Sequence, residues 1–116
     1  MNSATTSSNP RFGLFTRDAS NRLTYEIYAL EIATYLVLCG MIVEHYKLTT
    51  TEHLIVGLDE IFQDWQRGDD RIGLDWDIWS GFMVVAKTIG SENLVVEIGD
   101  WLELNRDEIS KPSNDR

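Results

Sequence analysis

The longest apolar stretch of the sequence runs from Tyr28 to Val43 and contains one charged side chain, Glu31. A helix that is apolar on all sides lies either inside a protein or inside a membrane. Sixteen residues would span about 24 Å as a helix, which is shorter than the ~30 Å hydrocarbon layer of a bilayer. Glu31 would also have to lie within that layer. We therefore predict a central, buried helix over residues 25–46 of a soluble domain.

The length of 116 residues fits a single domain with a core of its own. We place this domain at residues 11–108 and predict flexible, polar tails at residues 1–10 and 109–116. The first tail lacks the apolar stretch of a secretory signal. The single cysteine, Cys39, cannot form an internal disulfide, and its apolar neighbours indicate a buried, unreactive thiol. These features predict a cytoplasmic protein.

Three further helices are predicted after the central one. Thr49 and Glu52 have the spacing of a capping box. The apolar residues that follow recur on one helical face: Leu54, Ile55, Leu58, Ile61, Phe62 and Trp65. Asp75 is expected to cap a third helix that ends at Gly90, and Ser91 to start a fourth. Short connections favour antiparallel neighbours, so the predicted fold is all-α, a compact bundle of about four helices.

Two segments allow a second interpretation. Residues 11–16 and 23–27 flank a polar turn at 18–21, which is compatible with a short N-terminal hairpin as well as with an extended arm. Residues 93–104 have helical spacing, but apolar and other residues also alternate there. A strand in that segment therefore stays open beside the predicted helix.

Charge is distributed unevenly along the chain. The net charge is −9, and residues 59–108 hold thirteen acidic and four basic side chains, whereas residues 1–58 hold five and four. Direct binding to nucleic acid needs basic surface, so we do not expect it. An acidic surface favours association with a basic protein. A solvated acidic face without a partner is the simpler interpretation and also stays open.

No residue pattern demands a catalytic or metal site. His45 and His53 are the only histidines, and neither belongs to a Glu-x-x-His pair. The acids at 69–77 do not match a calcium loop, and nucleophile and phosphate-binding motifs are absent from the sequence. Glu31 is the best single candidate for a general acid or base, but the simpler interpretation is that it pairs with a buried Tyr or Arg, such as Tyr35, Arg17 or Arg22. We expect no cofactor, no metal and no enzymatic activity.

Carboxylates and tryptophans interleave in the sequence from residue 59 to residue 79. Tryptophan is enriched at the centres of protein interfaces, and acidic rims speed the encounter with basic partners. We therefore predict a partner-binding surface from these residues: Asp59, Glu60, Asp64, Trp65, Asp69, Asp70, Asp75, Trp76, Asp77 and Trp79. In the other interpretation, the tryptophans are core anchors and the acids are helix caps.

With its size, its acidity and the stretch from Asp59 to Trp79, the chain resembles the bacterial immunity proteins of contact-dependent and other polymorphic toxin systems. The resemblance lies in the overall profile and not in a motif. It implies a non-catalytic inhibitor whose carboxylates stand in for nucleic-acid phosphates on a basic, nuclease-type toxin domain. The alternative is a small helical adaptor or regulatory subunit that acts through protein–protein or homodimer contacts.

Overall fold

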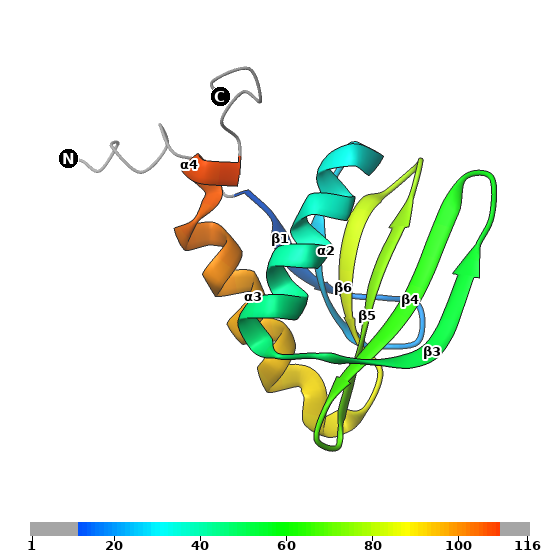
Figure 1. The fold of residues 1–116 in the computed structure, drawn as a ribbon, viewed down its shortest axis with the longest axis vertical. Coiled ribbons are helices and arrows are strands. Elements are labelled where there is room, and N and C mark those ends of the chain that lie inside the picture. Colours follow the sequence, from blue (N-terminus) through cyan, green and yellow to red (C-terminus); the bar gives the residue numbers. More distant parts are fainter. Residues whose placement is uncertain (1–11, 110–116) are drawn as a thin grey trace.

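The computed structural model describes residues 12–109 of the chain. Its strands and helices follow in this order: β1 Leu14–Arg17, β2 Leu23–Ile27, α2 Ile32–Tyr46, β3 Thr49–Val56, β4 Glu60–Arg67, β5 Asp70–Asp77, β6 Gly81–Ala86, the 3-10 turn Ile89–Ser91, α3 Glu92–Leu104 and α4 Arg106–Ile109. The strands form one sheet in the order β1-β2-β6-β5-β4-β3, and every neighbouring pair is antiparallel. Figure 1 shows this sheet curving behind the two long helices.

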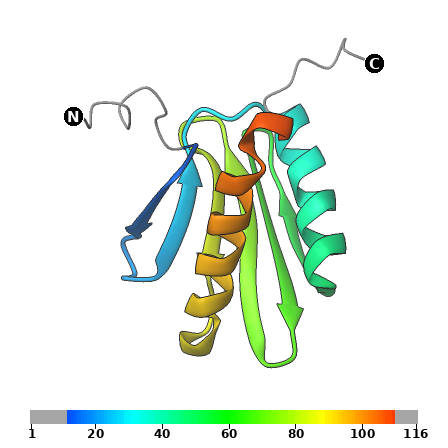
Figure 2. The same cartoon turned by 90° about the vertical axis from the view of Figure 1, so that its left-hand side faces the viewer.

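Both long helices lie on the same face of the sheet. α3 covers β2 and β6, and α2 packs on β5, so that the two helices lie side by side (Figures 1 and 2). The core between the layers is made by alternate strand residues and by the inner sides of the helices. Its largest fully buried side chains are Tyr25, Tyr35, Phe82, Leu38, Ile42, Ile72, Leu74, Leu94, Ile98 and Leu102.

The predicted all-α bundle of four helices is wrong. Residues 49–86, for which two helices were predicted, form the four strands β3–β6 instead. The apolar residues of the predicted second helix are divided between β3 and β4, because the chain turns at Leu58 and Asp59. Thr, Val, Ile, Phe and Trp are common in this segment, and such residues favour a pleated, half-buried surface. Short apolar runs do not distinguish a helix from a strand by spacing alone.

The segment predicted as a third helix from Asp75 to Gly90 holds the end of β5, a turn and β6. Along β5, Ile72, Leu74 and Trp76 are buried, as expected for alternate residues on the covered face of a sheet. Gly81 at the start of β6 has a φ of +86°, and a Cβ there would come within 2.5 Å of the Ile27 carbonyl oxygen. This turn therefore depends on glycine.

In the N-terminal half of the chain, the structure agrees in part with the prediction. α2 forms the second part of the predicted central helix, while the first part becomes β2 and pairs with β1. The hairpin alternative for residues 11–27 is thus the one that the structure forms. Residues 92–104 form α3, and the strand alternative there is wrong. Cys39 is buried as predicted, and burial raises the pKa of its thiol to about 12.

The predicted tails at 1–10 and 109–116 lie outside the described residues, except for Ile109, which ends α4. Within residues 12–109, no helix is both long enough and apolar enough to cross a membrane.

Candidate functional site

Four of the predicted partner-binding residues do not form an exposed cluster of acidic and aromatic side chains. These four are Trp65, Asp69, Asp70 and Trp76. Trp76 is buried, and its indole Nε1 donates to the Leu30 carbonyl oxygen at 2.8 Å. Trp65 is half-buried and packs against the core. For these two residues, the interpretation as core anchors is the one that the structure supports. Asp69 and Asp70 lie at the turn between β4 and β5, which is a separate place on the molecule.

Asp64 and Asp75 are buried on the sheet face that points away from the helices. The Lys87 ammonium lies between them, with Nζ 3.2 Å from Asp64 Oδ1 and 3.8 Å from Asp75 Oδ2. Gly73 makes room for this contact, since a Cβ there would lie 2.6 Å from Lys87 Cε. The other oxygen of Asp75 accepts the Gln63 backbone N–H at 3.1 Å. Both acids are therefore covered by Lys87 and the strands, and neither contributes to an exposed surface in this structure.

The buried cluster carries more negative than positive charge. Two carboxylates face one ammonium group, and burial disfavours the charged form of Asp75. Burial raises the pKa of Asp75 to about 6, although Lys87 and the Gln63 N–H act in the opposite direction. The cluster therefore takes up a proton at mildly acidic pH.

The remaining four predicted residues meet at one end of the sheet. Three connections come together there, and we call residues 28–31, 57–60 and 77–80 the loop end (Figure 1). The Ile78 N–H donates to the Asp59 carbonyl oxygen at 3.0 Å, and the Ala29 N–H donates to the Ser80 carbonyl oxygen at 3.4 Å. These bonds join the three connections into one surface. The structure thus brings together Asp59, Glu60, Asp77 and Trp79.

Trp79 is an exposed aromatic residue in the turn between β5 and β6 of this surface. Its side chain is 66% exposed, and its backbone is held by the Asp77 carboxylate. Asp77 Oδ1 accepts the N–H groups of Trp79 at 2.9 Å and of Ser80 at 2.6 Å. Short polar side chains commonly stabilise turns in this way. The indole is therefore presented to solvent from an ordered turn.

The charge at the loop end has one sign. Its three segments contain four carboxylates, Glu31, Asp59, Glu60 and Asp77, and no lysine, arginine or histidine. None of these four acids takes part in an ion pair with another of the described residues. Glu60 also lies directly opposite Asp77 in the β4–β5 register. The loop end is thus an acidic surface that also carries an exposed indole.

Sequence reasoning missed three exposed apolar residues of the loop end, which are Tyr28, Leu58 and Ile78. It assigned each of them to a predicted helix. It also treated Glu31 as a buried carboxylate, whereas Glu31 is exposed and precedes α2, with its carbonyl oxygen accepting the Tyr35 N–H. Nothing in the local sequence signals this grouping, because it follows from strand pairing.

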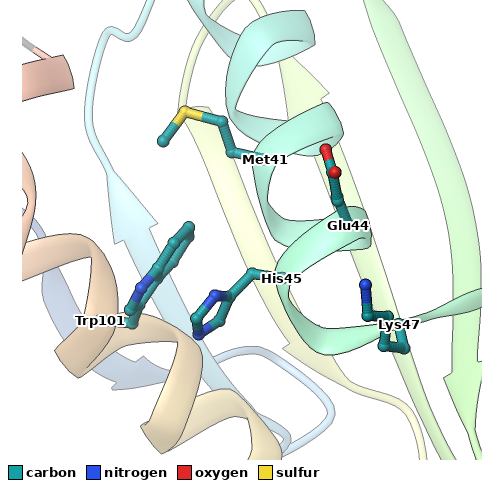
Figure 3. Close-up of a pocket in the computed structure, with 5 residues that line it drawn as sticks. All are labelled: Met41, Glu44, His45, Lys47 and Trp101. Carbon is teal, nitrogen blue, oxygen red and sulfur yellow. The ribbon is translucent and has the colours of Figure 1, made fainter.

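A second surface feature is a pocket of about 430 Å³ between α2 and α3 (Figure 3). The His45 ring stacks on Trp101 with the ring centroids 4.3 Å apart, and Tyr46 meets both rings edge-on. In Figure 3, Glu44 and Lys47 lie on the side away from Trp101. Glu44 and Lys47 therefore do not converge on the His45 and Trp101 rings. We interpret this pocket as the seam where aromatic packing joins the two helices.

Among the described residues, no group of three His, Cys, Asp or Glu side chains is placed to hold a metal ion. No protein-family model, no curated protein and no solved structure matches this chain.

Proposed function

We propose that the protein binds a basic protein partner through the loop end and does so without catalysis. The observation that carries this proposal is the exposed Trp79 indole on a loop surface whose three segments hold four carboxylates and no basic side chain. An aromatic anchor inside a charged rim is the usual arrangement of a protein interface. The charge of the rim selects a partner of opposite charge and speeds association.

Parts of the arrangement are locally unfavourable for the isolated fold. Glu60 and Asp77 are like charges placed directly opposite each other on neighbouring strands, which is unfavourable for pairing. The Trp79 indole leaves most of its surface in water. Local features that oppose stability are expected where function requires them.

The ordered turn at Trp79 supports the same proposal. Its conformation is held by the hydrogen bonds to Asp77 and by the link between Ile78 and Asp59. A turn whose backbone is already ordered loses less entropy on binding than a flexible one. Trp79 is thus prepared to act as the buried anchor.

The partner class that fits the acidic surface is a cationic toxin domain. This part of the proposal rests on the resemblance to bacterial immunity proteins in size and acidity. The loop-end carboxylates would occupy the positions of nucleic-acid phosphates on the toxin, and this would block its substrate surface. The protein would then be an immunity protein that inhibits a nuclease-type toxin in the same cell.

A second candidate function is that of an adaptor or regulatory subunit that forms a homodimer. It is favoured by the exposed apolar side chains Leu36 and Val37 on α2, because such patches mark interaction surfaces. Sedimentation of the isolated chain separates the two functions. An adaptor of this kind associates with itself as concentration rises, whereas the proposed inhibitor stays a monomer until its partner is added.

The test of the main proposal is capture of the partner from the native host by the tagged chain, followed by its identification. We expect a protein with a positive net charge that arrests growth when expressed alone and is neutralised by co-expression of this chain. Trp79→Ala should greatly reduce the capture, and Asp59→Lys should reduce it by a smaller amount. Asp69→Lys is the matched control, because Asp69 is also an exposed acid in a two-residue hairpin turn. Equal capture by all three variants would remove the loop end from the interface.

A further inference from the structure

The outer edge of β3 presents a row of backbone groups that pairs with no strand of residues 12–109. β3 is the last strand of the sheet, next to β4 only, and it lies at the outer edge in Figure 1. Its final residues Leu54, Ile55 and Val56 are 53%, 49% and 64% exposed. Exposed apolar edge strands attract other strands, and proteins usually protect them.

The hydrogen-bond pattern shows which groups point outward. The Gly57 N–H donates to the Glu60 carbonyl oxygen at 2.8 Å, which makes these two residues a hydrogen-bonded pair. Such pairs alternate with non-bonded pairs along an antiparallel ladder. Ile55, which lies opposite Phe62, therefore directs its N–H and C=O toward β4. Leu54 and Val56 direct theirs toward the open edge.

The other edge of the sheet is protected. β1 has four residues and ends at the charged Arg17, which pairs with Glu92 on α3. Before β1, the N–H groups of Phe12 and Gly13 donate to the Glu103 carboxylate. Shortness and charge are common means of preventing edge pairing. β3 has no charged residue between Leu54 and Val56.

The charge of the molecule selects the occupant of this edge. The β3 strand runs directly into the loop end, where Asp59 and Glu60 follow Val56 by a few residues. A second copy of this chain would bring another net charge of −9, which opposes association. A basic segment has the complementary charge. The edge therefore favours a strand from a basic partner over a second copy.

We infer that the open edge of β3 binds an extended basic segment of the partner, which pairs antiparallel with Leu54–Val56 and reaches the loop-end carboxylates with its N-terminal residues. Antiparallel pairing is the stronger of the two arrangements. It places the start of the incoming strand beside Asp59, because β3 itself runs toward the loop end. Main-chain hydrogen bonds provide the binding, and basic side chains provide the selection. The basic character of the segment rests on the proposed function, whereas the strand pairing rests on the edge alone.

The probe is a synthetic peptide of two arginines followed by alternating valine and threonine. Its binding to the full chain is measured by titration, and backbone amide exchange is followed by NMR with and without the peptide. We expect the amides of Leu54 and Val56 to become protected, while that of Ile55 is protected already. Unchanged exchange of Leu54 and Val56 at saturation, or no binding at peptide concentrations up to about 1 mM, would overturn the inference.

A proline substitution separates main-chain pairing from side-chain contact. Val56→Pro removes an outward N–H, which an edge strand tolerates, and should weaken peptide binding about tenfold. Val56→Thr keeps the N–H and the branched shape, so it should bind within about twofold of the native chain. If Val56→Pro does not fold, Leu54→Pro replaces it, with Leu54→Thr as its control. Equal binding by the proline and threonine variants would contradict strand pairing.

The charge contribution is tested independently. Replacing the two arginines of the peptide by glutamines should lower its affinity for the native chain but not for Asp59→Lys. If proline at Val56 weakens binding and Asp59→Lys does not, the edge inference stands and the proposed acidic surface fails. If Asp59→Lys weakens binding and proline at Val56 does not, the proposed acidic surface stands and the edge inference fails.

Discussion

Two sets of carboxylates on neighbouring strands of the same sheet have opposite surroundings. Asp64 and Asp75 are buried around Lys87, whereas Asp59 is exposed, and Glu60 and Asp77 beside it pair with no basic side chain among the described residues. The first set is a structural cluster whose charges must be balanced inside the protein. The second set has no basic partner among the described residues, and it is the set that we propose to meet a binding partner. The acidic residues of this sequence therefore fall into a buried group and a solvent-facing group, and the role of each group can be tested by substitution.

The largest effect is expected at Lys87. Lys87→Met would leave two buried carboxylates without a cation, and removal of one member of a buried ion pair typically costs about 3–5 kcal/mol. We expect a loss of this order in the free energy of unfolding measured by urea denaturation at pH 7. Arg71→Met is the control, because Arg71 is exposed, and it should change stability by less than about 0.5 kcal/mol. Similar values for both variants would show that Asp64 and Asp75 do not depend on Lys87.

The next effect concerns the pH dependence of stability. The pKa of Asp75 is raised from 3.8 to about 6 in the folded state. The folded protein therefore holds a proton that the unfolded chain has lost between these pH values, and stability from this group falls as pH rises through 6. Asp75→Asn should remove this fall. Its stability relative to the native chain should rise by about 2 kcal/mol between pH 4 and pH 7.

The measurement is the difference in unfolding free energy between the two proteins at each pH, since the other titrating groups are common to both. A difference that stays constant from pH 4 to pH 7 would mean that Asp75 is solvated and not confined by burial.

A third effect separates folding from binding. Trp79→Ala should change the free energy of unfolding by less than about 0.5 kcal/mol, because the side chain is mostly exposed. Its affinity for the captured partner should fall by about 2 kcal/mol or more, as is usual for an interface anchor. Ile89→Ala is the control, since Ile89 is exposed in the turn before α3. Loss of affinity in the control as well would point to non-specific apolar binding.

The smallest effect is expected when single acids are replaced in the turns at the two ends of β4. Asp59→Lys should weaken partner binding by about 0.5–1 kcal/mol and reduce its sensitivity to salt. Asp69→Lys changes the net charge by the same amount but lies at the other end of the strand, so it should leave both quantities nearly unchanged. Equal effects would mean that only the net charge of −9 matters and that its position does not.

Part of this structure could be predicted because it depends on local chemistry. The continuous apolar run from Ile32 to Val43 is helical in α2, and Cys39 within it is buried. The spacing of Leu94, Val95, Ile98 and Leu102 correctly indicates α3, whose inner side these residues form. In both segments, one stretch of chain supplies all the backbone hydrogen bonds of its element. The local pattern was therefore sufficient.

The strands could not be predicted in the same way. Leu54 pairs with Gln63, and Trp76 pairs with both Ile61 and Phe82, so each strand is stabilised by residues from elsewhere in the chain. Strand propensity depends on these neighbours more than on the residue itself. The turn at Gly68–Asp69 was a usable signal, because Gly-Asp between two apolar runs is typical of a hairpin. The helical spacing of the apolar residues from Leu54 to Trp65 favoured the other interpretation.

Three features of this protein were determined by the sequence alone. They are its net negative charge, its long apolar helix and the alternation of tryptophans with carboxylates between residues 59 and 79. The tertiary structure alone decided which of those side chains meet solvent. Strand pairing placed Trp76 in the core and Trp79 at the tip of the same hairpin, and it placed Asp75 beside Lys87 while leaving Asp59 exposed. The physical reason is that successive side chains of a strand point to opposite faces of the sheet. At the strand ends, the connecting turns bring together residues that are far apart in the sequence. A residue's place in a strand therefore decides its environment more than its chemical type does.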